Sequence, residues 1–153
     1  MQSRQLIQSA LFMLLLCFLV FLFDISTQPN DLITFGDNVW YLNRAHLIWQ
    51  GVLPDLFVYT LSYPAVVGLI DFVTKDVILA GMIVNALLLW CILLGVYILG
   101  YWLYARPRIA WLAVLLVVFN ASILDAQTFF SGTIPFVAAN VWILVACVFV
   151  VRR

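Results

Sequence analysis

The stretch 77-VILAGMIVNALLLWCILLGVYILGYWLY-104 decides the class of this protein. It contains no charged residue, and Asn85 is its only strongly polar side chain. A helix needs about 20 mostly apolar residues to cross the hydrocarbon core of a bilayer. The stretch is therefore predicted to form a transmembrane helix, long enough to tilt or to overshoot into the interface.

The composition of the whole chain agrees with a membrane location. Of its 153 residues, 67% are hydrophobic and 9% are charged, and the mean hydropathy is +1.16. Soluble domains are about 45–50% apolar and about 25% charged. A chain of this size cannot bury so much apolar surface in its own core, so the lipid bilayer is its expected partner. The formal net charge of zero argues against a nucleic-acid partner.

Three further segments have the length and character of membrane spans, or come close. They are Leu6–Phe23, Ile109–Leu124 and Ile134–Val151. Pro107 stands just before the third of the four spans, a position that suits a helix start. We therefore predict an all-α, polytopic membrane protein with about four transmembrane helices.

The connection between the first two spans, Asp24–Asp76, holds most of the charge. Helical periodicity over Asp37–Trp49 and a short apolar run at Pro64–Val73 predict two interfacial or re-entrant helices there. The expected organisation is one membrane domain, 1–153. It comprises a first span within 1–23, a long outer loop at 24–76, and three further spans within 77–153. Because Arg152 and Arg153 follow directly after a span, we expect the chain to be truncated at its C-terminal end.

The charges predict an orientation in the membrane. With four alternating spans, Arg4, Arg106, Arg108, Arg152 and Arg153 fall on one side, and all seven acidic residues fall on the other. An excess of Lys and Arg marks the cytoplasmic side. A multi-pass protein with a cytoplasmic N-terminus is expected, in the plasma (inner) membrane, and its long loop would face outward.

The outer loop is the candidate site for chemistry. At helical spacing, Asp37, Tyr41 and Arg44 lie on one face, and they form either a solvated stripe with an ion-pair tendency or a functional set. Asp37 is either the acidic cap of a helix or a general base. Arg44 could pair with a lipid phosphate or with neighbouring aspartates. Asp125, after the third span, is an outer interfacial charge or part of the site.

The order of these features resembles the N-terminal part of the GT-C superfamily of glycosyltransferases, which use polyprenyl-phosphate-linked sugars. Protein mannosyltransferases and the aminoarabinose transferase of lipid A are examples. The resembling pattern is D-x-x-x-Y-x-x-x-A, then G-x-x-P, then an aromatic residue before proline. In this chain it consists of Asp37, Tyr41, Ala45, Gly51, Pro54 and the Tyr63-Pro64 pair.

The resemblance implies an activity. Asp37 would be the catalytic general base, while Tyr41, Arg44, Tyr63 and Asp125 would bind substrate. The chain would move a sugar from its polyprenyl-phosphate donor to an unknown acceptor on the outer face. Many members of the superfamily have a second acid where this chain has Asn38, so the use of a divalent metal stays open and no metal ligand is assigned. The alternative is a non-catalytic membrane protein, a scaffold or accessory subunit of a lipid-linked-sugar pathway.

Overall fold

The computed structural model describes residues 3–27, 37–52, 62–120, 122–123 and 133–152. Every longer regular element in these ranges is an α-helix, which confirms the predicted all-α class. The helices are α1 (Ser3–Thr27), α2 (Asp37–Trp49), α3 (Ser62–Thr74), α4 (Val77–Tyr104), α5 (Pro107–Val118) and α7 (Thr133–Val151).

Three of these helices, α1, α4 and α7, are long and apolar enough to cross a membrane. The expected third span, Ile109–Leu124, is not confirmed. Its helix α5 has 12 residues and is about 18 Å long, against a hydrocarbon core of about 30 Å. Helix α5 ends where Asn120 begins a local turn, because the Asn120 side chain accepts hydrogen bonds from the backbone N–H groups of Ser122 and Ile123.

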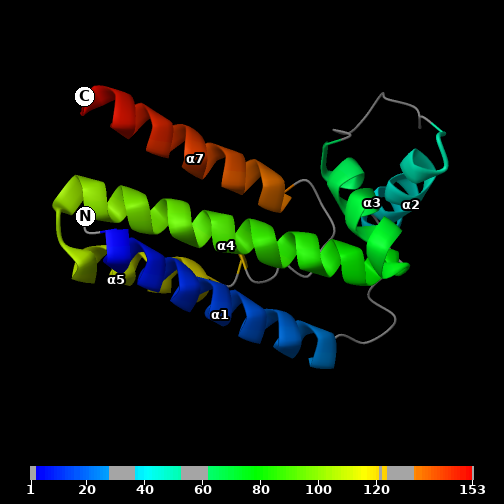
Figure 1. The fold of residues 1–153 in the computed structure, drawn as a ribbon, viewed down its shortest axis with the longest axis horizontal. Helices are drawn as coiled ribbons and strands as arrows, with labels where there is room; N and C mark the ends of the chain where they lie inside the picture. The colour runs from blue at the N-terminus through cyan, green and yellow to red at the C-terminus, as the bar shows by residue number, and fades with distance from the viewer. Residues whose placement is uncertain (1–2, 28–36, 53–61, 121, 124–132, 153) are drawn as a thin grey trace.

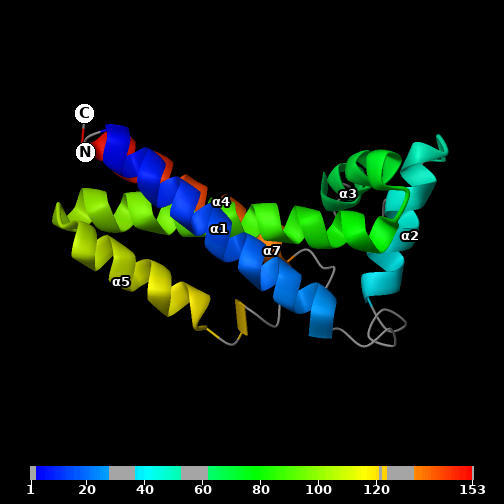
Figure 2. The ribbon, with the colours of Figure 1, turned by 60° about the horizontal axis from the view of Figure 1, so that its bottom comes forward.

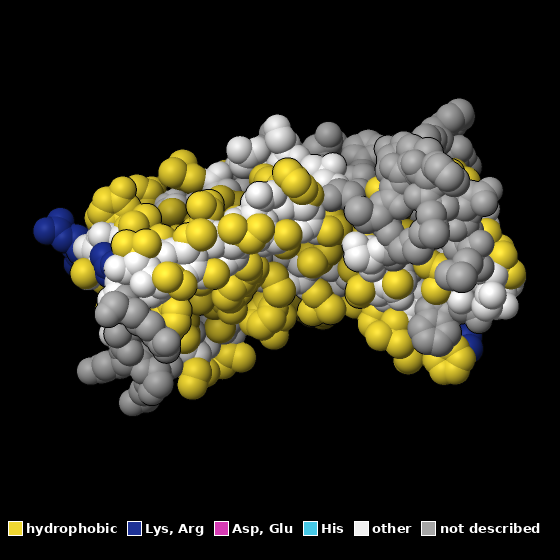
Figure 3. Space-filling model, turned by 90° about the horizontal axis from the view of Figure 1, so that it is seen from above, with side chains coloured by type: hydrophobic (Ala, Val, Ile, Leu, Met, Phe, Trp, Pro, Cys, Tyr) yellow, Lys and Arg dark blue, Asp and Glu magenta, His cyan; other side chains and the backbone are white. Residues whose placement is uncertain are grey.

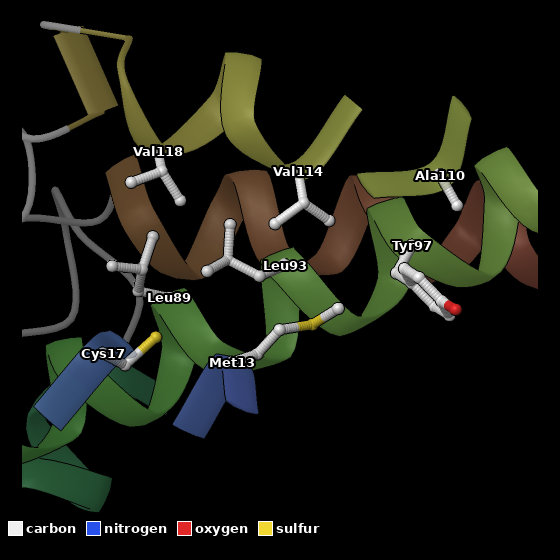
Figure 4. Packing of buried hydrophobic residues seen from close by; sticks show 8 residues of the cluster. All are labelled: Met13, Cys17, Leu89, Leu93, Tyr97, Ala110, Val114 and Val118. Atoms are coloured by element: carbon white, nitrogen blue, oxygen red, sulfur yellow. The ribbon is translucent and has the colours of Figure 1, made fainter. Parts of the chain in front are cut away.

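Helix α4 is the axis around which the other helices pack (Figure 1). Helices α1, α5 and α7 lie along its length, and α3 contacts its first turns. The main buried cluster joins α1, α4 and α5 (Figure 4) and comprises Met13, Cys17, Leu89, Leu93, Tyr97, Ala110, Val114 and Val118.

Small residues and indole groups set the close helix contacts along α4. A Cβ atom on Gly95 would lie 2.5 Å from Cγ1 of Val141 in α7, so only glycine allows this approach. On the same side, the indole N–H of Trp142 donates to the carbonyl of Cys91, 3.2 Å away. The indole N–H of Trp90 donates to the carbonyl of Ala10 in α1 at 3.0 Å. The Trp142 bond therefore connects α7 to α4, and the Trp90 bond connects α4 to α1.

Local sequence explains where α4 begins and ends. The Asp76 carboxylate accepts hydrogen bonds from the N–H groups of Ile78 and Leu79, at 3.0 and 3.1 Å, as an N-cap does. At the other end, Ala105 takes the left-handed conformation with φ 54°, and Pro107 opens α5. The chain therefore reverses tightly between α4 and α5.

The two ends of the molecule differ in character. The α4–α5 turn lies at the same end as the start of α1 and the end of α7, while α2 and α3 lie at the opposite end (Figures 1 and 2). Arg106, Arg108 and Arg152 belong to the first end by their places in the helices. Figure 3 shows Lys and Arg side chains at that end, a smaller Lys or Arg patch at the opposite end, and hydrophobic side chains along the helices between the ends. This surface suits contact with lipid.

Candidate functional site

The predicted site residues, apart from Asp125, belong to the helix pair α2 and α3. Two of the predicted residues are described only in part or not at all. Asp37 is the first residue of α2, as its position in the sequence predicts, but its side chain lies outside the described part of the structure. Asp125 lies outside the described residues altogether. Tyr41 and Arg44 are on α2, and Tyr63 is in the first turn of α3.

The structure brings Tyr41, Arg44 and Tyr63 into the interior. Their exposed fractions are 4%, 8% and 3%. The interpretation of Tyr41 and Arg44 as part of a solvated stripe is therefore wrong. Trp40, Leu47 and Ile48 are only partly buried, because α2 turns the face of Tyr41, Leu42, Arg44 and Ala45 toward its neighbours.

Two tyrosines join α2 to α3. The rings of Tyr41 and Tyr63 meet edge to face, with centroids 5.6 Å apart and planes at 75°. Such pairs stabilise by about 0.5–1.5 kcal/mol beyond the area they bury. The contact fixes the buried face of α2 against the start of α3.

Tyr63 also joins α3 to the membrane helix α4. Its hydroxyl donates a hydrogen bond of 2.8 Å to Oδ1 of Asn85, and both side chains are buried. Burial raises the pKa of the Tyr63 phenol well above its ordinary value, and the neighbouring Tyr41 adds a smaller rise. The phenol therefore stays protonated and remains a donor.

Arg44 is the buried cation of the site. Its guanidinium carbon lies 3.1 Å from the centroid of the Trp40 ring, a cation–π contact. Its Nη1 atom is buried and has no hydrogen-bond partner among the described residues. A buried cationic donor without an acceptor is costly, so this guanidinium has the capacity to bind an anionic group.

A second polar group lies on the exposed side of the same helix pair. Nδ1 of His46 is 3.7 Å from Oδ2 of Asp71, and Nε2 of His46 is 2.8 Å from the amide nitrogen of Gln50. These three residues line an open pocket of about 350 Å³ with Phe72, Lys75 and Val77. Our sequence analysis missed this pocket. The signal available was the i, i+4 spacing of His46 with Gln50 and of Asp71 with Lys75.

Asn85 is a buried polar residue of this region that was not among the predicted site residues. Its signal was visible, because a lone polar side chain within an apolar span is rare and usually has a specific partner. That partner, Tyr63, is 22 residues away in the chain, and sequence alone does not reveal it.

The described residues contain no cluster suited to a resident metal ion. No group of three or more His, Cys, Asp or Glu side chains comes together in the ranges that the structure covers. The site described here consists of aromatic rings, an amide and a guanidinium, which can orient and hold an anionic or hydroxyl-rich molecule. Comparison of the chain with models of protein families, with characterised proteins and with solved structures finds no match in any of the three.

Proposed function

We propose that the chain carries the outer-face site of a membrane glycosyltransferase of the GT-C type. The observation that carries the proposal is the buried Arg44, whose Nη1 atom has no acceptor among the described residues, on the helix that Asp37 opens. The two residues are seven positions apart, so they lie about two turns, or about 10 Å, apart on one helix face. In the proposal the base and the cation act from these two positions on the same sugar phosphate.

In the proposed topology the chain crosses the membrane four times, with α5 and the residues after it forming the third crossing. The N-terminus is then cytoplasmic, and α2 and α3 lie on the outer face. Support comes from Arg106, Arg108 and Arg152, which belong to the end opposite to α2 and α3. An excess of basic residues favours the cytoplasmic side.

The proposed reaction uses Asp37 as general base. Its carboxylate takes the proton from an acceptor hydroxyl or amine while the acceptor atom attacks the anomeric carbon of the sugar. The bond from that carbon to the phosphate oxygen breaks, and the polyprenyl phosphate leaves with the electron pair. The guanidinium of Arg44 stabilises the charge that develops on the phosphate, while Tyr41 and Tyr63 hold α2 and α3 in place.

An apolar pocket supports a prenyl donor. It has a volume of about 430 Å³ and lies between α1 and the half of α4 that is closer to α2 and α3. Its lining is apolar apart from one thiol and consists of Leu14, Cys17, Phe18, Phe21, Leu79, Ile83, Ala86 and Leu87. The first isoprene units of a lipid donor would fit such a lining.

The test is the substitution Asp37→Asn in the full-length protein. Membranes that contain the variant would be supplied in turn with tritiated polyprenyl-phosphate glucose, mannose and aminoarabinose, and the transferred label counted. Loss of the general base should lower transfer about 100-fold or more, with normal expression. The matched control, Asp31→Asn, changes another acid of the same loop and should transfer normally. Unchanged transfer by Asp37→Asn would refute the assigned role.

One observation favours a second candidate, a non-catalytic scaffold or accessory subunit. Tyr41 and Tyr63 belong to the hydrophobic cluster that holds α2 and α3 on α4, as residues with a purely structural role would. In that case Asp37→Asn leaves transfer unchanged, and variants of Tyr41 and Tyr63 change only stability.

A further inference from the structure

The pocket on the exposed side of α2 and α3 has the chemistry of a binding site for a zwitterion. Its polar lining consists of one carboxylate, Asp71, one ammonium, Lys75, and the His46 and Gln50 side chains. Asp71 is largely buried, with its side chain 12% exposed, whereas the His46 side chain is 60% exposed. A ligand that carries one positive and one negative group would leave neither Asp71 nor Lys75 with an uncompensated charge.

The polar lining offers donors for a phosphate at Lys75 and an acceptor for an ammonium at Asp71. Because an amide nitrogen only donates, the contact with Gln50 makes Nε2 of His46 the acceptor and directs its Nδ1–H toward Asp71. At 3.7 Å the distance from Nδ1 to Oδ2 of Asp71 is longer than a hydrogen bond, so the carboxylate keeps lone pairs for an ammonium. The Lys75 ammonium lies 4.4 Å from the centroid of the Phe72 ring and provides three donors for a phosphate.

The surroundings of the pocket place it at the membrane surface. It adjoins Val77, the first residue of the spanning helix α4. The adjoining helix α3 is apolar and too short to span, and it exposes a row of large side chains. These are Val66, Leu69, Phe72 and Val73, exposed by 50%, 54%, 59% and 78%. An exposed apolar face beside a polar pocket is typical of a helix that lies in the lipid interface.

We propose that this pocket binds the head group of an aminophospholipid of the bilayer, with the phosphate at Lys75 and the primary ammonium at Asp71. The acyl chains then pass along Phe72 and Val73 into the hydrocarbon. The site is separate from the buried face of α2 that carries Arg44, and the inference does not depend on the proposed glycosyltransferase activity.

The test uses the purified full-length protein and native mass spectrometry. The protein is mixed with equal amounts of phosphatidylethanolamine and phosphatidylglycerol of identical acyl chains, which share the phosphate and differ in the amine. We expect the wild type to retain more phosphatidylethanolamine. Asp71→Asn should lower retention of that lipid about fivefold and leave phosphatidylglycerol unchanged, and Lys75→Gln should lower both about fivefold.

Control variants and a soluble competitor make the outcomes decisive. Arg108→Gln removes a cation at the other end of the molecule and should leave both lipids bound as in the wild type. An unchanged lipid ratio in Asp71→Asn, or unchanged binding in Lys75→Gln, would overturn the proposal. Soluble glycerophosphoethanolamine at the same concentration should not displace the lipid. Full displacement would assign the pocket to a soluble zwitterion and overturn the lipid assignment.

Discussion

The hydrogen bond between Tyr63 and Asn85 offers a quantitative test of how the outer helices are attached to the membrane helix. Tyr63→Phe and Asn85→Leu each remove one partner while nearly preserving side-chain volume. The bond is 2.8 Å long, and the exposed fractions of the two residues are 3% and 1%. Each single variant leaves a buried polar group with one partner fewer, which costs about 1–3 kcal/mol.

The double variant should lose less stability than the two single losses added together. When both partners become apolar, no polar group of the pair remains to be desolvated. Coupling energies between polar side chains in membrane proteins average about 0.6 kcal/mol and reach about 1.7 kcal/mol. Because both groups here are almost fully buried, we expect a coupling of about 1 kcal/mol between Tyr63 and Asn85.

The assay is equilibrium unfolding in mixed micelles of dodecylmaltoside and SDS, followed by the near-ultraviolet circular dichroism of the tryptophans. The four proteins of the cycle give four free energies of unfolding, and their double difference is the coupling energy. A matched control cycle pairs Tyr63→Phe with Trp142→Phe, which removes a distant hydrogen bond to Cys91. The control should be additive. Additive losses in the Tyr63–Asn85 cycle as well would refute the inference that this bond holds α3 on α4.

Three further outcomes follow from the fold. Gly95→Ala should cost about 1–3 kcal/mol of unfolding free energy, because its methyl group meets Val141, and Val141→Ala in the same protein should restore most of the loss. Asp76→Ala should cost about 1 kcal/mol through loss of the α4 cap, whereas Asp76→Asn should retain most of that stability. Because the pKa of Tyr63 is raised on folding, its contribution is complete below its ordinary pKa of about 10 and declines above it. In alkaline titrations of unfolding, the wild type should therefore lose stability more steeply than Tyr63→Phe. Equal slopes would contradict that assignment.

Sequence patterns predicted the helices where local signals were strong. The bounds of α2, Asp37–Trp49, and of α4, Val77–Tyr104, agree with the predicted ranges because an acid, a glycine or an aromatic belt marks their ends. Helix α1 continues past Asp24 to Thr27, since no glycine or proline interrupts it, and the Ser26 hydroxyl donates to the Phe23 carbonyl. The apolar run of the sequence extends beyond the end of α5. The helix ends earlier because the Asn120 side chain accepts a hydrogen bond from a backbone N–H group that would otherwise continue the helix.

The site itself was only partly predictable. Helical spacing correctly placed Tyr41 and Arg44 on one face. It could not tell whether that face meets water or protein, because its burial depends on how α2 and α3 dock on α4. The pairing of His46 with Asp71 and of Tyr63 with Asn85 also arises from that docking. The role of Asp37 stays a prediction.

The length of α4 has a consequence for the membranes in which the protein is stable. Its 28 residues extend about 42 Å, about 12 Å more than the hydrocarbon core. In the proposed membrane placement, Tyr101, Trp102 and Tyr104 mark one boundary, and the excess length lies at the end near α3. Counted back about 20 residues from Tyr101, the opposite boundary falls about one helical turn outside Asn85. In this placement the bond from Tyr63 lies just below the head groups, where acyl-chain length would control its access to water. Longer-chain lipids should strengthen the attachment of α3, and shorter-chain lipids should weaken it.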